Sequence, residues 1–329
     1  MAELNGKNLR RTAGELVSAP GSPARRLVLI HTGLVVVLNL VVSWLNLLLN
    51  EKIGTTGGLS GMGLRSVLET MQTLLSYFTT LFVPFWSAGF LRAMIQLSRS
   101  QETGPRDLLL SFRRFGRIIS RSLLEMVILL GLCVGLTYLV TNVFLLTPFA
   151  RDFLTVMNSL GDVNTLLLPD GSLNLELLPV EQLIPTMIPM FIMYFLAFLP
   201  AYAFLNYQFR MTLFLLVEGI DRSAPASFFA SARLMKGHKW QMLKLDLHFW
   251  WFYVLEMLLT CVLYLDLILP ALGIALPVNA DAAFFITIAL YGILELGLHY
   301  WKKPQVDLTY ALAYDAIFQE ALGKIEQQN

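Results

Sequence analysis

Four carboxylates within or beside long apolar stretches are the residues of this sequence most able to do chemistry in a membrane. They are Glu125, Asp246, Glu256 and Glu295. A carboxylate in hydrocarbon is strongly destabilised unless it is paired, protonated or hydrated. Each is therefore expected either to bond a polar side chain of a neighbouring helix or to line a polar cavity. Since Glu256 and Glu295 lie near the middle of two successive apolar stretches, a cavity between them could carry protons or a substrate.

A second candidate is the basic and aromatic run Lys236-Gly237-His238-Lys239-Trp240. The glycine is expected to turn the chain between two helices, which places the next three side chains at the depth of the lipid headgroups. The run is then either an interface anchor or a site for the headgroup of a phospholipid or a phosphorylated ligand. Asp246 follows about two helical turns deeper, facing the bundle. Its candidate partners are Lys239, Lys244 and Arg210.

An earlier loop has a similar composition. Its basic residues are Arg113, Arg114 and Arg117, and its apolar stripe is Leu108, Leu109, Phe112 and Phe115. Both loops are expected to hold a short amphipathic helix that ends at a glycine, Gly116 or Gly237, and lies in the headgroup plane. Arg and Lys would there meet anionic lipid phosphates, although the same surface could dock a cytoplasmic protein partner.

The two loops also share features of their flanks. A carboxylate stands nine residues beyond each glycine, Glu125 and Asp246, and an arginine lies near the end of each preceding apolar stretch, Arg92 and Arg210. This spacing predicts a weak internal repeat of two-span hairpins. Convergence of short basic loops is the alternative explanation, because such loops recur between spans in any membrane protein.

The elements that position these residues are six apolar stretches. Apolar residues make up 56% of the chain, charged residues 14%, and the mean hydropathy is +0.63, which is typical of a membrane protein. The predicted spans are Leu27 to Leu49, Val67 to Leu97, Ile119 to Leu146, Ile184 to Val217, Leu245 to Leu272 and Ala282 to Trp301. Continuous apolar runs favour helices over barrel strands, so the predicted fold is an all-α transmembrane bundle.

The distribution of Lys and Arg predicts the orientation. Basic residues concentrate in the amino tail and in two loops, whereas the alternate loops hold Lys52, Arg65 and Arg151. Cytoplasmic loops carry the basic excess, so both termini are expected in the cytoplasm. The expected organisation is an amino tail at 1–26, a membrane domain at 27–301 and a carboxyl tail at 302–329, with cytoplasmic loops near 98–118 and 218–244 and a long outer loop near 147–183.

The other sequence patterns mainly argue against particular kinds of site. Cys133 and Cys261 fall within predicted spans, and the four histidines are scattered, so neither a disulfide framework nor a metal-ligand set is expected. The sequence lacks a clustered nucleophile and base and lacks a nucleotide-binding motif. We therefore expect no catalytic residue, no cofactor and no nucleic-acid partner, and we do not expect an enzyme.

The second loop carries a family resemblance. Ser231, the run Leu234 to Trp240 and Leu245-Asp246-Leu247 resemble the most characteristic stretch of a bacterial integral membrane family, domain of unknown function 975. Gly89-Phe90-Leu91 and Tyr310 to Phe318 are similar to that family more loosely. The chain departs from the family after Leu247, where it continues His248-Phe249-Trp250-Trp251. The resemblance implies architecture and compartment and assigns no chemistry.

Together these features predict a multi-pass protein of the cytoplasmic membrane, without enzymatic activity, that interacts with anionic lipids or a protein partner through its basic cytoplasmic face. The alternative is a small-solute or ion transporter or channel with a polar cavity around Glu256 and Glu295.

Overall fold

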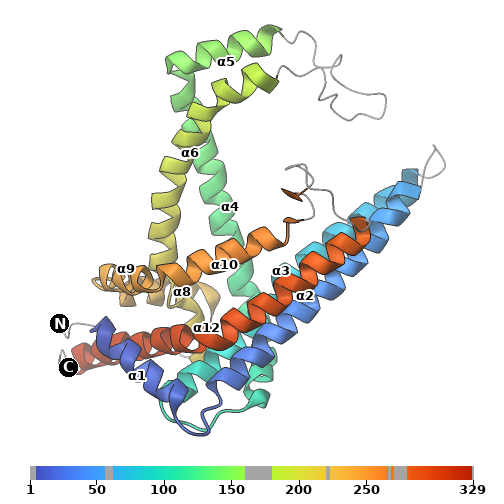
Figure 1. Ribbon diagram of the computed structural model, residues 1–329. Coiled ribbons are helices and arrows are strands. Elements are labelled where there is room, and N and C mark those ends of the chain that lie inside the picture. The colour runs from blue at the N-terminus through green and yellow to red at the C-terminus, as the bar shows by residue number, and fades with distance from the viewer. Residues whose placement is uncertain are drawn as a thin grey trace. The chain divides into compact units, whose positions relative to one another are not determined.

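The computed structural model describes residues 5–55, 62–159, 180–219, 223–265, 268–269 and 280–327 (Figure 1). Within these ranges the chain forms α-helices and one 3-10 helix, and it contains no strand. The predicted all-α class is confirmed. The chain divides into two compact units, Met1–Ser122 with Gln208–Asn329 and Leu123–Tyr207, which are described separately.

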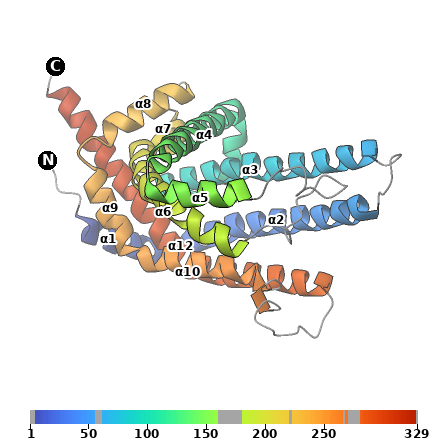
Figure 2. The same ribbon diagram turned by 90° about the horizontal axis from the view of Figure 1, so that it is seen from above.

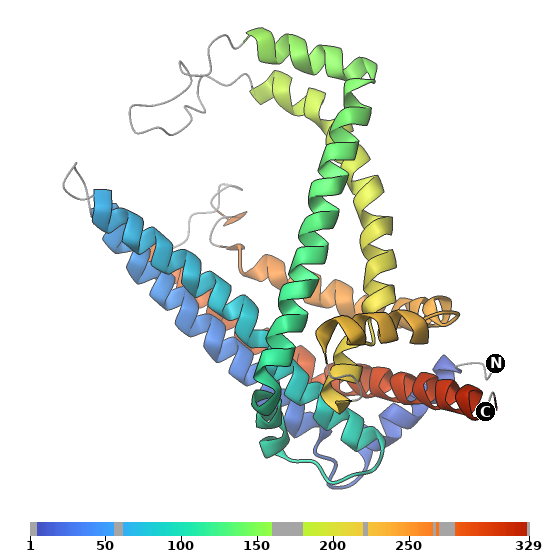
Figure 3. The ribbon, with the colours of Figure 1, turned by 180° about the vertical axis from the view of Figure 1, so that it is seen from behind.

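Three long helices run together in the first unit. They are α2 (Ala24–Thr55), α3 (Met62–Ser98) and α12 (Ala280–Glu326). Figures 1 and 3 show α2 and α3 side by side along most of their length, with α12 against them. The helices α2 and α12 approach each other tightly at Gly292, where an added Cβ would lie 2.9 Å from Val36 Cγ1. Glycine is therefore the residue that allows this pair of helices to pack.

Shorter helices gather around the last part of α12. They are α1 (Gly6–Ser18), η2 (Pro105–Arg114), α7 (Thr212–Glu218), α8 (Ala224–Leu234) and α9 (Lys239–His248). We call these helices, together with α12 from Pro304 onward, the helical base. Figure 2 shows that the last part of α12 lies among α1, α8 and α9. The expected carboxyl tail thus continues the α12 helix, and Leu308, Ala311, Tyr314 and Ile317 within it are fully buried.

The helical base is held to the long helices at specific contacts. Gly89 of α3 would bring a Cβ within 2.0 Å of the Leu108 backbone oxygen, so η2 packs directly on α3. Phe112 of η2 stacks on Phe85, with ring centroids 5.8 Å apart. Because η2 ends at Arg114 and α4 begins at Phe115, the expectation that Gly116 ends a helix is wrong. The η2 helix packs tightly on α3 and is therefore not a free interfacial helix.

The second unit contains most of α4 (Phe115–Leu145), all of α5 (Pro148–Ser159) and most of α6 (Val180–Phe209). Large apolar side chains on α4 and α6 are exposed, among them Val134 at 62% and Leu196 at 69%. Such exposure is expected of residues that face lipid instead of a protein core. Most of the long loop predicted near 147–183 lies outside the described residues, although its beginning forms α5.

Five described helices are long and apolar enough to cross a membrane, and a sixth span results if α9 and α10 (Trp250–Val262) count as one. These two helices meet at Phe249 with a bend of 61°. The fifth predicted span, Leu245 to Leu272, is therefore not a straight helix. Its start belongs to α9, and α10 covers the part from Trp250 to Val262. The expectation of about six spans is confirmed.

Candidate functional site

A groove between α8 and α9 collects the basic residues of the second loop. It has a volume of about 720 Å³. Its lining residues are Gln208, Phe229, Ala232, Arg233, Lys236, Gly237 and Lys239. Three cations and one large aromatic ring thus share a single concavity, which we call the α8–α9 groove.

Local sequence explains why α8 presents its charges to this groove. Ser223 caps the helix by accepting a hydrogen bond from the Ala226 amide at 3.4 Å. Phe228 and Met235 are buried beneath the helix, at 4% and 0% exposure, whereas Phe229 is 72% exposed. Phe228 therefore lies in the core, and Phe229 lies on the surface.

The turn after α8 depends on glycine. Gly237 has φ +91°, a left-handed conformation that other residues rarely adopt, and α9 starts two residues later at Lys239. The expectation that Gly237 turns the chain between two helices is confirmed, whereas the amphipathic helix α8 ends at Leu234, three residues earlier than expected. Lys239 lies in the first turn of α9 and donates a hydrogen bond to the Gln208 side chain.

Ser231 fixes the floor of the groove. Its hydroxyl accepts a hydrogen bond from the Met211 amide at 3.1 Å and donates one to the Gln208 carbonyl at 3.1 Å. Met211 and Gln208 flank the break between α6 and α7, where helical backbone groups lose their partners. A fully buried serine on α8 therefore satisfies that break and holds α8 against it.

Asp246 pairs with Arg210, one of its three predicted partners. Arg210 donates to both carboxylate oxygens, at 2.5 and 2.8 Å, and the Tyr310 hydroxyl donates to Oδ1 at 2.5 Å. The Arg210 guanidinium also lies 4.5 Å from the centre of the Tyr310 ring. Because the charges and hydrogen bonds are matched, this is a structural ion pair that joins the residue directly after α6 to α9 and α12.

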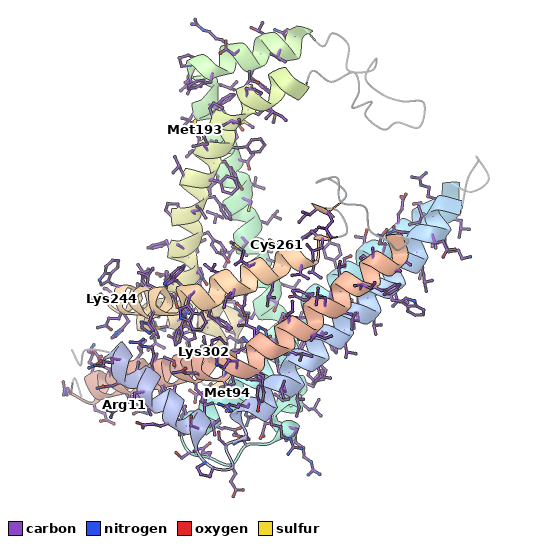
Figure 4. The ribbon with its side chains drawn as sticks, in the orientation of Figure 1. Arg11, Met94, Met193, Lys244, Cys261 and Lys302 are labelled. Carbon is purple, nitrogen blue, oxygen red and sulfur yellow. The ribbon has the colours of Figure 1, made fainter. Side chains whose placement is uncertain are left out.

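The other predicted headgroup residues lie in different surroundings. Trp240 is 62% exposed, with the Lys244 ammonium 6.0 Å from its ring centre. Figure 4 shows Lys244 on α9 and Arg11 on α1, both on the helical base. His238 is buried instead, and its ring bonds Gln241 at 3.0 Å. The His238 side chain therefore packs inside the base and does not line the α8–α9 groove.

Fewer of the predicted site residues of the first basic loop lie in the described part of the structure. Arg117 is exposed at the start of α4. The side chains of Arg113 and Arg114 lie outside the described part of the structure. Glu125 on α4 is half-buried and has an interaction partner. The predicted repeat, in which Glu125 would correspond to Asp246, stays a prediction.

A second ion-pair centre was missed by sequence reasoning. Arg99, just after α3, pairs with Asp315 on α12 at 2.5 Å and with Glu218 at the end of α7. Tyr314 donates to Glu218, and Ser98 donates to Asp315 at 2.7 Å. Burial of the guanidinium would lower the pKa of Arg99, but hydrogen bonds and charges from Asp315 and Glu218 raise it above its usual range. The sequence could have indicated this centre only if α12 had been predicted as one continuous helix that carries Asp315.

The remaining acids meet a histidine within the long helices. His299 on α12 bonds the Thr32 hydroxyl through Nδ1 at 2.9 Å and Glu256 of α10 through Nε2 at 3.0 Å. Glu295 lies one turn away on α12, and its Oε2 is buried without a hydrogen-bond partner among the described residues. The structure therefore brings Glu256 and Glu295 to one region, with His299 between α2 and α10.

Comparisons with known proteins give one finding. The sequence model of a family described as "Protein of unknown function (DUF975)" matches residues 24–321. The match includes α2, α3, α12 as far as Ala321, the α8–α9 groove and both ion-pair centres, in keeping with the resemblance seen in the second basic loop. Comparison with the curated proteins and with the solved structures gives no match.

Proposed function

The chain belongs to the DUF975 family of proteins of unknown function, and we propose that it is a non-enzymatic component of the bacterial cytoplasmic membrane that binds anionic phospholipids through its α8–α9 groove. In this proposal both termini and the helical base face the cytoplasm, where anionic lipids are found.

The observation that carries the proposal is the combination of charge and apolar surface in one concavity. Arg233, Lys236 and Lys239 supply cations for a phosphate, while exposed Phe229 offers a ring to the upper part of an acyl chain. A basic residue near an anionic membrane surface contributes about 1 kcal/mol, so three contribute roughly 3 kcal/mol. That is roughly a 100-fold preference over a zwitterionic lipid.

Flanking residues favour a lipid over a protein partner. Trp240 stands beside the groove and is 62% exposed, and Trp is enriched at membrane interfaces. A groove at headgroup depth is open to the lipids that surround the helices at all times. A cytoplasmic protein partner would use the same cations, and the test below distinguishes the two.

The test is lipid retention in nanodiscs that contain phosphatidylglycerol and phosphatidylcholine, followed by native mass spectrometry. The wild type should retain phosphatidylglycerol. The variant Arg233→Gln, Lys236→Gln, Lys239→Gln should lose it, whereas the control Arg11→Gln, Arg25→Gln, Arg26→Gln removes equal charge elsewhere and should keep it. Equal retention of both lipids by the wild type, or equal loss in both variants, would reject the proposal. A co-purified protein lost only from the groove variant would favour a protein partner instead.

A second candidate function, transport of a small solute or an ion, is favoured by the contact of His299 with Glu256. Intramembrane ionisable residues are rare, and in transporters they form ion and proton pathways. This candidate uses the long helices and is independent of the α8–α9 groove.

A further inference from the structure

Ionisable side chains recur at every fourth position along α12. They are Tyr291, Glu295, His299, Lys303 and Asp307, which we call the polar ladder. Four residues advance an α-helix by about 6 Å, so the ladder extends over about 24 Å, most of the thickness of a hydrocarbon core. Each step turns the side chain by about 40°, which keeps successive members as near neighbours.

His299 is the junction of the ladder with neighbouring helices. Its two ring nitrogens contact Thr32 of α2 and Glu256 of α10, at 2.9 and 3.0 Å. His31, also on α2, lies within electrostatic range of His299 and Lys303. An imidazole bonded on both sides across three helices is held in one orientation, since either neighbour would resist its rotation.

One proton can move within this junction without any movement of heavy atoms. If the proton is on the ring, Nε2 donates to the Glu256 carboxylate; if it is on Glu256, the carboxylic acid donates to Nε2. In both states Nδ1 keeps its hydrogen and donates to the Thr32 hydroxyl. His299 and Glu256 thus exchange a proton between an ion pair and a neutral pair, and the net charge of the two groups stays the same.

The groups on either side of the junction are buried and polar. Glu295 Oε2 and both ring nitrogens of His31 are buried and have no hydrogen-bond partner among the residues that the structure describes. Buried polar atoms of this kind are normally satisfied by internal water, and water connects titratable groups about 6 Å apart. The ladder therefore has the composition of a hydrated proton path.

Each end of the ladder approaches water. At one end a cavity of about 510 Å³ lies between α2 and α12, lined by Ser43, Asn46, Leu47, Asn50, Glu51 and Phe284. Phe284 precedes Tyr291 by two turns, about 10 Å along the axis. At the other end Lys303 and Asp307 pair at 3.5 Å, and their side chains remain 21% and 19% exposed beside the helical base. Close packing at Gly292 and Val36 shields the helix contact between these ends.

We propose that the polar ladder, with His299 and Glu256 as its proton-exchange pair, conducts protons between the α2–α12 cavity and the helical base. The inference rests on the second candidate function, transport, and names the proton as the transported ion. It is independent of lipid binding in the α8–α9 groove.

The test uses the full chain reconstituted in vesicles that contain a pH-sensitive dye, with a potassium diffusion potential set by valinomycin. Wild-type vesicles should change internal pH faster than protein-free vesicles. His299→Gln and Glu256→Gln should each lower the rate by at least about tenfold, because a positioned proton acceptor is removed. Glu256→Asp keeps the carboxylate and should retain part of the flux.

Matched controls change the same residue types elsewhere. Glu69→Gln and His248→Gln alter exposed side chains outside the ladder and should leave the flux unchanged. Gel filtration and circular dichroism identify any variant that fails to fold, and Glu256→Asp then takes its place. No flux above protein-free vesicles, or equal flux in wild type and ladder variants, would overturn the proposal. Parallel vesicles with a sodium-sensitive dye separate the two claims. Sodium flux without proton flux rejects the ladder but retains ion transport, and the absence of both fluxes rejects the ladder and the transport of these two cations.

Discussion

Arg210, which directly follows α6, and Asp246 of α9 form a two-point ion pair, with nitrogen–oxygen distances of 2.5 and 2.8 Å. Their side chains are 18% and 20% exposed, so the pair is largely withdrawn from solvent. Since Tyr310 also bonds this carboxylate, a single acid joins the residue that follows α6 to α9 and α12. The pair is therefore a structural support of the α8–α9 groove above it.

Asp246→Asn should destabilise the first unit. Removing one partner of a buried pair leaves the other charge uncompensated, which costs about 3 kcal/mol. The thermal unfolding midpoint in detergent should fall clearly, whereas Asp152→Asn, an exposed acid on α5, should leave it unchanged. An Asp246→Asn protein as stable as the wild type would show that the pair contributes nothing.

The stabilising effect of Arg99 should persist at mildly alkaline pH. Its folded pKa is raised above the ordinary value of an arginine, so its contribution is complete below that ordinary value and is lost only as pH rises through the still higher folded pKa. The difference in unfolding midpoint between wild type and Arg99→Gln should be the same at neutral and at mildly alkaline pH. A difference that shrinks over this interval would contradict the assigned ion pair with Asp315 and Glu218.

Gly237→Ala should distort the groove, and Gly116→Ala should not. Gly237 has φ +91°, where a Cβ costs about 1 kcal/mol or more. Gly116 lies inside α4 with nothing within 4 Å of an added Cβ, so alanine there should be neutral or stabilising through its higher helix propensity. Unfolding midpoints and phosphatidylglycerol retention measure both effects. Equal behaviour of the two variants would remove the special role of the Gly237 turn.

Gly89→Ala should detach η2 from α3. The added Cβ would lie 2.0 Å from the Leu108 oxygen, a backbone atom that cannot rotate away, so the strain should reach at least about 2 kcal/mol. Hydrogen exchange should rise over Pro105–Arg114 in this variant. Gly131→Ala, which meets nothing within 4 Å, is the control. Unchanged protection of η2 would contradict this packing.

Local sequence features predicted much of the architecture. The length of the apolar stretches predicted the membrane spans, and Gly237 predicted the turn after α8. Both features depend on neighbouring residues alone. For Asp246, the sequence reduced the candidate partners to three cations. The choice of Arg210 over Lys239 and Lys244 requires knowing how the segment directly after α6 packs against α9, which depends on contacts between distant residues.

The ladder and the Arg99 centre could not be predicted for a different reason. Lys302 and Lys303 end the apolar run, so hydropathy placed the end of the span at Trp301 and treated the following residues as a tail. The helix in fact continues to Glu326, which puts Lys303, Asp307 and Asp315 on one element. The packing of η2 on α3 likewise depends on Gly89, which belongs to another helix.

The central claim, that the α8–α9 groove holds an anionic headgroup, is tested most directly by photocrosslinking. A phosphatidylglycerol with a photoreactive headgroup would be added to membranes that contain the protein, and the labelled peptides would be mapped by mass spectrometry. We expect label concentrated on the segment from Phe229 to Trp240, and we expect excess unlabelled phosphatidylglycerol, but not phosphatidylcholine, to remove it. Label spread evenly over the exposed faces of α4 and α6, with no enrichment at that segment, would contradict the claim.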